Sequence, residues 1–248
     1  MSDVLIIGKG VVGSNLGEEL SVLAPDYSDP PLGIKPKNKR YKFGFVCVDT
    51  PLKDGTLDIS IVKSAIVEND CDIYVIKSTV PVGFTDKIAG ETGKKILFSP
   101  EYYGSTQHAN SKTFDFTILG GNKDVAHETQ QLLQKVYSAY HSFMIVDAKT
   151  AELAKLMENA WIATKVTFCC EFAKAAAETG VDYTTLREAF LKDPRVSASH
   201  TFVYDETPFW DSHCLNKDVV CAANQLEIEL LKYIVEINDK SKRACSLR

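Results

Sequence analysis

Three side chains in the second half of the chain carry groups suited to covalent and electrostatic catalysis: the thiol of Cys214, the amine of Lys155 and the amide of Asn159. Cys214 stands just before a segment with a helical pattern and close to Lys217. A cysteine near a helix N-terminus and a cation is expected to have a lowered pKa and a larger thiolate fraction. Asp218 follows four residues later, where a carboxylate could orient or deprotonate a neighbour. Cys214 is therefore a hypothesis for a nucleophile, with an inert packing cysteine as the alternative.

Lys155 and Asn159 belong to a segment that reads as a long helix beginning near Thr150, a possible N-cap. Together with Glu152 they line one face of that helix. The apolar residues between positions 153 and 168 cover nearly every face of this helix, which is typical of a helix buried in a core or a subunit interface. A lysine and an asparagine in such surroundings cost free energy. The pattern favours a functional pair, and a solvated polar stripe is the alternative.

The N-terminus combines an apolar strand pattern with a glycine motif. Residues 4–7 read VLII, as in a buried parallel strand, and run into Gly8-Lys9-Gly10-Val11-Val12-Gly13 at the start of a helical pattern. In such a GxGxxG motif the first glycine allows a tight turn, the second lets the backbone approach a pyrophosphate, and the third lets helix and strand pack closely. The helix N-terminus favours the anion. The motif predicts a dinucleotide cofactor, and a glycine-rich turn without a ligand is the alternative.

An acidic residue about 20 positions beyond the motif would bind the adenosine ribose and favour NAD over NADP. Asp26 and Asp29 both qualify. We favour Asp29, because it could end a short second strand. The alternative is an acidic loop residue that contacts only solvent. The rest of residues 26–42, rich in Pro, Lys and Asp, predicts an irregular loop.

Strand and helix patterns alternate along the first half of the chain. Strands are predicted at residues 43–48, 72–76, 95–98 and 117–121, and helices at 57–67 and 125–137. The alternation indicates a doubly wound parallel sheet, in which ligands bind at the carboxyl ends of the strands.

Polar residues cluster at these strand ends: Thr50, Ser78, Thr79 and Glu101. Turn chemistry is the alternative for each of them taken alone. The segment after residue 149 is helical, with helices expected at 150–178, 182–192 and 217–238. The predicted fold class is α/β: a Rossmann-like domain over residues 1–148, followed by an all-helical dimerisation domain over residues 149–248.

The amino-acid composition excludes several classes of function. The chain has 248 residues, 45% hydrophobic and 25% charged, and 28 Lys+Arg against 33 Asp+Glu give a net charge of −5. The acidic balance argues against a nucleic-acid partner. No apolar run approaches the ~20 residues of a membrane span, and the start lacks the features of a signal peptide. Seven scattered cysteines without a CxxC pair predict neither a disulfide framework nor a metal site, and suggest a cytoplasmic protein.

Motifs along nearly the whole chain resemble, in order, those of the UDP-glucose/GDP-mannose dehydrogenase family. The matching stretches are Gly8–Gly13, Val48–Pro51, Lys77–Pro81, Ser99–Tyr102, Ala151–Asn159, Asp193–Arg195 and Cys214–Asp218. The resemblance implies oxidation of the C6 alcohol of a nucleotide sugar to a carboxylate with two NAD, through a cysteine thiohemiacetal and thioester. It also implies a homodimer, for which the apolar helix 150–178 would supply the interface.

The resemblance implies a role for each matching residue. Cys214 would be the nucleophile, and Lys155 and Asn159 would stabilise the oxyanion and contact the substrate. Asp218 and Thr79 would position water or transfer protons, and Glu101 would assist deacylation. Glu101, Tyr102, Tyr103 and Arg195 would bind the substrate, Arg195 across the dimer interface. The cofactor-binding residues would be Gly8, Lys9, Gly10, Val11, Val12, Gly13, Asp29, Thr50, Ser78 and Thr79.

The sequence also departs from the family pattern. It is shorter than the members of the family, which continue into a C-terminal nucleotide-binding domain. In addition, Ser105 stands where the family has a second glutamate after the Pro-Glu motif. Residues 208–213, before the cysteine, contain no glycine, whereas the family has a glycine-rich loop there. Two alternatives therefore stay open. One is a catalytically impaired paralogue that binds NAD and partners a longer subunit. The other is a β-hydroxyacid dehydrogenase-like enzyme that needs no cysteine.

Overall fold

The computed structural model describes residues 2–103 and 114–246 and divides into two compact units. Unit 1 comprises Met1–Lys53 and Leu57–Lys155, and unit 2 comprises Asp54–Thr56 and Leu156–Arg248. The sequence predicts a domain boundary at 148/149. The units of the structure meet a little later, between Lys155 and Leu156, because one unbroken helix carries the chain from one unit into the other.

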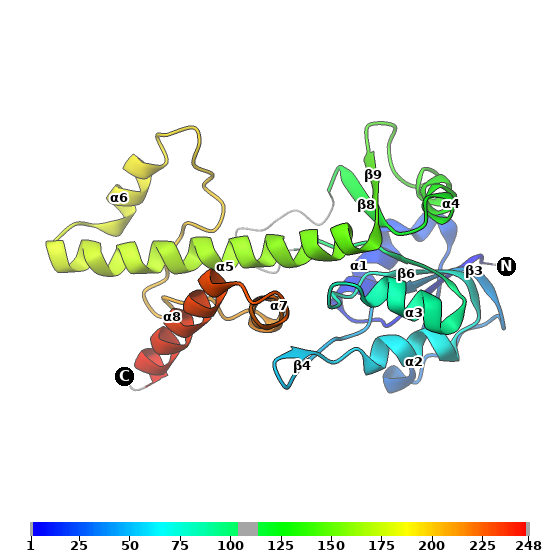
Figure 1. The fold of residues 1–248 in the computed structure, drawn as a ribbon. Coiled ribbons are helices and arrows are strands. Elements are labelled where there is room, and N and C mark those ends of the chain that lie inside the picture. The colour runs from blue at the N-terminus through cyan, green and yellow to red at the C-terminus, as the bar shows by residue number, and fades with distance from the viewer. Residues whose placement is uncertain (1, 104–113, 247–248) are drawn as a thin grey trace. The chain divides into compact units, whose positions relative to one another are not determined.

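Unit 1 is built on one seven-stranded sheet in the order β2-β1-β3-β6-β7-β8-β9 (Figure 1). The strands are β1 (Val4–Ile7), β2 (Asp26–Ser28), β3 (Tyr41–Val46), β6 (Cys71–Ile76), β7 (Lys95–Phe98), β8 (Phe116–Gly120) and β9 (Ser142–Val146). The pairings are parallel except that between β7 and β8. A short hairpin, β4 (Leu52–Lys53) and β5 (Thr56–Leu57), turns at Asp54 and Gly55, both with positive φ. The α/β prediction is confirmed, with one antiparallel pairing.

Helices cover both faces of this sheet. The helices are α1 (Val11–Glu19), α2 (Ser60–Glu68), α3 (Phe84–Thr92) and α4 (Lys123–Leu133), with 3-10 turns η1 (Ser21–Leu23) and η2 (Pro30–Leu32). Alternate residues of each strand point to opposite faces. Accordingly, Leu5 and Ile7 pack with α2 and α3, while Val4 and Ile6 pack with α1 and α4. Burial on both faces is why these strands are continuously apolar.

The chain direction across the sheet reverses at β1, which lies between β2 and β3. In doubly wound sheets a ligand binds outside the carboxyl ends of the strands at such a switch point. Here those ends are followed by the glycine motif at Gly8–Gly13 and by Val48–Thr50. The topology therefore places both predicted cofactor segments at the expected edge of the sheet.

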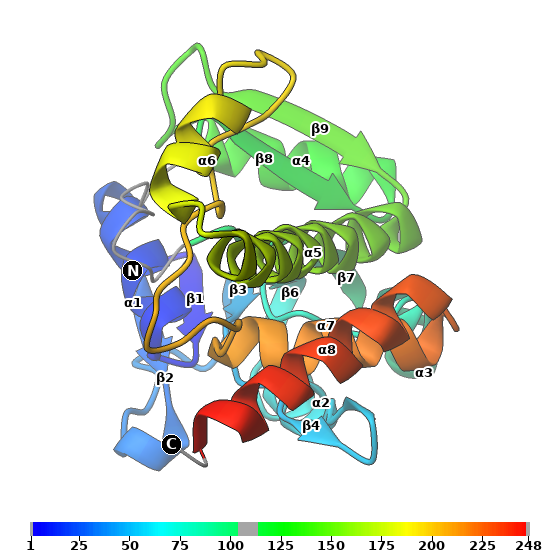
Figure 2. The same cartoon turned by 90° about the vertical axis from the view of Figure 1, so that its left-hand side faces the viewer.

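Unit 2 is all-helical. It contains most of α5 (Ala148–Thr179), together with α6 (Tyr183–Phe190), α7 (His213–Gln225) and α8 (Glu229–Ser246). Helices α7 and α8 lie side by side in both views (Figures 1 and 2). Its core includes Ala163 and Trp210, and the Trp210 indole donates a 3.0 Å hydrogen bond to the Thr167 hydroxyl. None of the helices in the described residues is long and apolar enough to cross a membrane.

Three local predictions need correction. The long helix begins at Ala148 and its first turn is capped by Asp147, whose carboxylate accepts hydrogen bonds from Thr150, so Thr150 is not the N-cap. The single helix predicted at 217–238 is two helices, because the chain turns at Glu227, where φ is +51°. The segment 26–42, predicted irregular, contains β2 and η2.

Gly13 is where α1 approaches the turn after β1 most closely. A Cβ built there would lie 1.9 Å from the Gly8 carbonyl oxygen, so either helix or turn would have to shift. We predict that Gly13→Ala lowers the free energy of unfolding by about 3 kcal/mol or more, as overpacking against backbone does. Urea denaturation measures the change.

Gly10→Ala is the matched control, because a Cβ at Gly10 meets nothing within 4 Å. Equal denaturation midpoints for the two variants would show that the close approach at Gly13 does not constrain the fold.

Candidate functional site

The glycine motif has the geometry that its sequence predicts. Gly8 follows β1 with φ +95°, and its N–H donates to the Ser28 carbonyl at 2.8 Å. Helix α1 then begins at Val11, which is exposed like Gly10 before it. The turn thus exposes its backbone at a helix N-terminus, where N–H groups can bind a phosphate group.

Asp29, rather than Asp26, lies beside this motif. Its carboxylate accepts a 2.7 Å hydrogen bond from the Lys9 N–H and a 3.2 Å one from the Leu32 N–H, at the end of β2. Both acids are buried, but Asp26 accepts its hydrogen bonds from the Tyr41 hydroxyl and from the backbone N–H of Lys37. Burial opposes the ionisation of Asp26, but these hydrogen bonds outweigh it and hold its pKa below the usual value. Asp26 is therefore part of the fold, and Asp29 is the acid next to the predicted cofactor loop.

The polar residues after β3 and β6 come together because these strands are neighbours. The Thr50 hydroxyl donates to the Thr79 carbonyl at 2.9 Å, and the Ser78 hydroxyl donates to the Val48 carbonyl at 2.6 Å. Thr50 and Ser78 are both buried. These two hydrogen bonds connect the segment after β3 with the segment after β6. This edge of the sheet is therefore held in place by the protein itself.

Glu101 follows β7 in a short irregular segment. Its carboxylate accepts a 2.8 Å hydrogen bond from the Tyr103 N–H. The segment is also held by Lys77, whose ammonium donates to the Ser99 hydroxyl at 3.2 Å and to the Pro100 carbonyl at 3.3 Å. Burial lowers the pKa of Lys77. Sequence reasoning did not assign a role to Lys77, although a lysine directly after a buried strand was a visible signal.

Lys155 lies against an aromatic ring. Its ammonium nitrogen is 4.8 Å from the centroid of the Tyr102 ring, within range of a cation–π interaction. Tyr102 packs in turn against Phe116, with ring centroids 5.3 Å apart. Because Lys155 is buried, the aromatic face compensates part of the cost of removing its charge from water.

Glu152, one turn before Lys155 on α5, has a structural role. Its carboxylate accepts hydrogen bonds from the N–H groups of Gly83 and Thr85, at the start of α3. Burial raises the pKa of Glu152, although these hydrogen bonds act in the opposite direction. Of the three polar residues on the predicted helix face, Glu152 therefore caps a helix and is not free for catalysis.

Within unit 2, Asn159 and Asp218 meet in a buried polar cluster. The Asn159 amide donates to one carboxylate oxygen of Asp218 at 2.6 Å, and the Lys217 ammonium lies 2.8 Å from the other. Asp218 is fully buried and the other two are nearly so. Each oxygen of the Asp218 carboxylate therefore has a hydrogen-bond donor, which compensates its buried charge. The same contact orients the Asn159 side chain. Lys217 was not assigned to the site from the sequence, although it stands within the Cys214–Asp218 motif.

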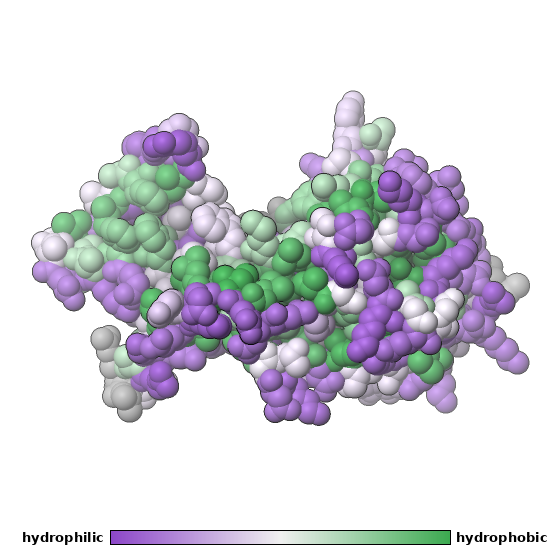
Figure 3. Space-filling view, in the orientation of Figure 1, coloured by the Kyte–Doolittle hydropathy of each residue, from purple (hydrophilic) through white to green (hydrophobic). Residues whose placement is uncertain are grey.

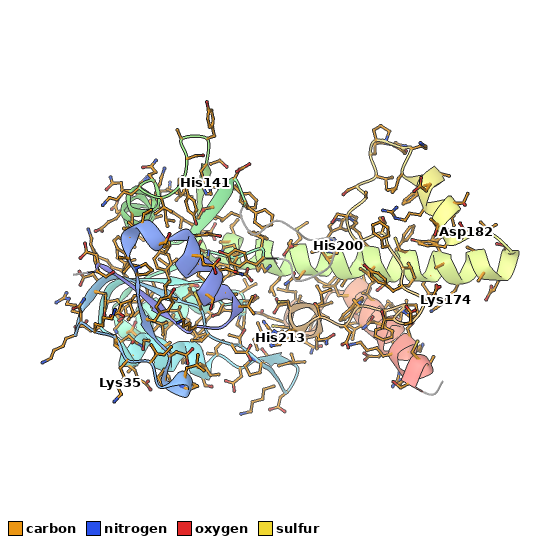
Figure 4. All side chains as sticks on the ribbon, turned by 180° about the vertical axis from the view of Figure 1, so that it is seen from behind. Lys35, His141, Lys174, Asp182, His200 and His213 are labelled. Atoms are coloured by element: carbon orange, nitrogen blue, oxygen red, sulfur yellow. The ribbon has the colours of Figure 1, made fainter. Side chains whose placement is uncertain are left out.

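Cys214 is the second residue of α7 and is exposed. The Ser212 hydroxyl caps the helix by accepting from the Leu215 N–H at 3.1 Å, and His213, labelled in Figure 4, is the first helical residue. Lys217 and Asp218 are three and four residues further on, so they share the helix face of Cys214. The predicted position of the thiol at a helix N-terminus agrees with this geometry.

Arg195 is exposed, and its guanidinium pairs with Asp193, two residues earlier. The hydrogen bonds described for the Arg195 side chain go to the Asp193 carboxylate. Ser105 lies outside the described residues.

Unit 2 supplies an accessible thiol at a helix N-terminus and an amide fixed by a buried carboxylate. Unit 1, taken by itself, supplies a dinucleotide-type loop with an acid at its side. A thiol can add to a carbonyl carbon, and a fixed amide or ammonium can stabilise the resulting oxyanion. These are the groups needed to oxidise a substrate through a covalent intermediate.

Comparisons with known proteins show which family this chain resembles. Residues 149–240 match the model of the UDP-glucose/GDP-mannose dehydrogenase family, central domain. The chain is 26% identical over 216 residues to a UDP-glucose 6-dehydrogenase of Rickettsia prowazekii, covering 78% of this chain and 48% of that protein. It is 26% identical over 225 residues to a UDP-N-acetyl-D-mannosamine dehydrogenase of Methanocaldococcus jannaschii, covering 84% and 51%. The chain thus spans about half the length of these curated relatives.

A solved structure shares the fold. A UDP-glucose dehydrogenase from the hyperthermophilic archaeon Pyrobaculum islandicum superimposes with a TM-score of 0.79 at 20% identity, over 97% of this chain and 68% of that one. At this identity the likeness shows the fold alone. Together with the family match, it confirms the resemblance that the sequence motifs indicate.

Glu152 can be tested separately from the chemistry. We predict that Glu152→Ala lowers the free energy of unfolding by about 2 kcal/mol or more, because two backbone N–H groups at the start of α3 lose their acceptor. Since the pKa of Glu152 is raised in the folded state, its contribution to stability is greatest at low pH and is lost as pH rises through that raised pKa. Denaturation at several pH values measures both effects.

Glu178→Ala is the matched control, since Glu178 is exposed near the end of the same helix. It should change stability by less than about 0.5 kcal/mol. A Glu152→Ala variant as stable as this control would contradict the capping role.

Proposed function

From the premise that residues 149–240 resemble the central domain of UDP-glucose/GDP-mannose dehydrogenases, we propose that this chain is an NAD-dependent nucleotide-sugar dehydrogenase. It oxidises the C6 alcohol of the sugar to a carboxylate in two two-electron steps. The observation that carries the proposal is the exposed Cys214 at the start of α7, one turn before the buried Asp218 that holds Asn159.

The residues of unit 1 fit NAD. The first glycine adopts φ +95°, a Cβ at Gly10 would point into open space, and Asp29 stands at the end of β2 beside the loop. Gly8–Gly13 would bind the pyrophosphate, Asp29 the adenosine ribose, and the strand-end residues Thr50, Ser78 and Thr79 the nicotinamide half. When bound, NAD supplies a hydride acceptor.

Cys214 accounts for the covalent part of the chemistry. After the first oxidation, the thiolate adds to the aldehyde carbon. A C–S bond forms and the carbonyl oxygen takes the negative charge, which a proton neutralises in the thiohemiacetal. Lys155 would stabilise that oxygen with its ammonium and Asn159 with its amide. Loss of a second hydride from the same carbon, together with the hydroxyl proton, then leaves a thioester.

Hydrolysis releases the product. Glu101 would accept a proton from the water that attacks the thioester carbon, and Thr79 would help to position that water. The C–S bond breaks, the thiolate of Cys214 is regenerated, and the sugar leaves as a carboxylate. Asp218, whose two oxygens are occupied by Asn159 and Lys217, would act by orienting Asn159 rather than by moving protons itself. Arg195 and Tyr103 would contact the substrate, as the resemblance implies.

A second copy of this chain is the proposed partner. Helix α5 exposes a series of large apolar residues along one side: Leu153, Met157, Trp161, Phe168 and Phe172. Apolar residues gather along this helix in the space-filling view (Figure 3). Contiguous apolar patches are uncommon on soluble monomers and mark interaction surfaces. The resemblance to a dimeric family supports a homodimer through α5.

The nucleophile assignment predicts the fate of Cys214→Ser. With NAD and a panel of nucleotide sugars, the wild-type chain should form two NADH per sugar and a carboxylate product. Cys214→Ser should lose carboxylate formation by about 1,000-fold or more, because the thioester cannot form. NADH absorbance and mass spectrometry of the product measure this.

Cys245→Ser, at a free cysteine in α8, is the control and should behave like wild type. Wild-type carboxylate formation by Cys214→Ser would refute the assignment. A two-electron product made by both proteins would select a β-hydroxyacid-type enzyme. NAD binding without turnover, together with co-purification of a longer subunit, would select a non-catalytic paralogue.

The proposed interface predicts the effect of Trp161→Glu. Trp161 is 62% exposed, so the substitution should leave unit 2 folded and, by burying a charge in the interface, convert a dimer into a monomer. Light scattering after size-exclusion chromatography gives the mass of each species. Tyr233→Glu, at a 63% exposed site on α8, should leave the dimer intact. A monomeric wild-type chain would overturn the interface.

A further inference from the structure

Glu19, the last residue of α1, connects the helix of the glycine motif with the segment that carries Glu101. One of its carboxylate oxygens accepts a 2.7 Å hydrogen bond from the Tyr103 hydroxyl, and the other accepts a 2.8 Å hydrogen bond from the Tyr137 hydroxyl. All three residues belong to unit 1 and are partly buried. A carboxylate with a donor on each oxygen has a defined orientation, because both hydrogen bonds are charge-assisted.

Tyr103 is bound at both ends. While its hydroxyl donates to Glu19, its backbone N–H donates to the Glu101 carboxylate at 2.8 Å. Glu101 belongs to no helix or strand, so no ladder of backbone hydrogen bonds holds it in place. Its orientation thus depends on contacts such as this one. The hydrogen bonds form a continuous path from α1 through Tyr103 to Glu101.

The other side of Glu19 is supported by the segment between α4 and β9 and by β8. The Tyr137 ring stacks on the His141 ring with centroids 4.1 Å apart and an interplanar angle of 6°. The His141 Nε2 lies 2.8 Å from the Thr117 hydroxyl oxygen. Burial raises the pKa of both tyrosines. Both hydroxyls therefore remain protonated and keep donating at neutral pH. The anchor is a rigid group of side chains rather than a single contact.

We propose that Glu19 is a positioning residue for Glu101, acting through Tyr103. The inference rests on the proposed function, in which Glu101 serves hydrolysis of the thioester. Because Glu19 ends the helix that begins at the glycine motif, the same helix would fix the cofactor at one end and the base at the other. Glu19 itself touches neither substrate nor cofactor.

Glu19→Ala and Tyr103→Phe test the path. Both should speed amide hydrogen exchange in peptides covering residues 96–103, because the Glu101 segment loses its anchor. Both should also lower kcat for carboxylate formation about tenfold, with little change in the KM for NAD, since a misplaced catalytic group slows chemistry rather than binding. Glu18→Ala, at the exposed neighbouring carboxylate, and Tyr140→Phe, at a 95% exposed tyrosine, are the controls.

The double variant separates positioning from a direct substrate contact of Tyr103. If Glu19 acts through Tyr103, Glu19→Ala/Tyr103→Phe should be no slower than the worse single variant, because both changes break one path. Fully additive losses would overturn the inference, as would unchanged hydrogen exchange in Glu19→Ala, or faster exchange with unchanged kcat. Amide hydrogen exchange can be measured whether or not the chain is catalytically active. An inactive wild-type chain with faster exchange in Glu19→Ala would therefore refute the proposed function and the positioning role, while leaving the anchor itself established.

Discussion

Carboxylates removed from water must be compensated by donors, and this requirement shapes both units of the molecule. Glu152 ties α5 to the start of α3, and Asp218 ties α7 to Asn159 on α5. Asp29 ties the end of β2 to the glycine loop, and Glu19 ties α1 to the segment after β7. In each case the acid joins elements that the chain brings together from a distance. Removing one partner would leave an uncompensated charge, so these contacts specify the arrangement of the elements as well as stabilising it.

The parallel sheet of unit 1 explains why polar residues gather at one edge. Parallel strands end on the same side, so the segments after β1, β3, β6 and β7 lie along one edge of the sheet. Apolar burial on both faces leaves this edge as the place where polar groups meet solvent and ligands. Much of its chemistry is nevertheless internal: Thr50 and Ser78 bond to neighbouring carbonyls, and Lys77 holds the segment of Glu101. Internal hydrogen bonds therefore hold this edge in place, which would reduce the entropy cost of binding the proposed cofactor.

In the proposed function, unit 2 separates the reactive group from the group that positions its neighbour. Cys214 is exposed at the first turn of α7, whereas Asp218 on the next turn is fully buried. A nucleophile must be reachable, while a group that orients an amide works best where water cannot compete for its hydrogen bonds. One amphipathic helix meets both needs, because its N-terminal turn is open and the following turn faces the core. The same unit exposes Trp161 and its apolar neighbours on α5, which suits a surface completed by a partner.

The sequence by itself determined the class of most elements, and it predicted the candidate site residues. The apolar run before the glycine motif, the alternation that follows it, and the apolar helix around Trp161 all predict elements that the structure contains, because they depend on local periodicity and backbone preference. The tertiary structure decided which partner each polar side chain takes. It placed Asp29 beside the glycine loop and Asp26 against the Tyr41 hydroxyl, and it made Glu152 a helix cap. It also broke the last predicted helix at Glu227, where the residue types give no strong signal. Such outcomes depend on distances between atoms far apart in sequence, as with Asn159 and Asp218, 59 residues apart, and no pattern within one segment records them.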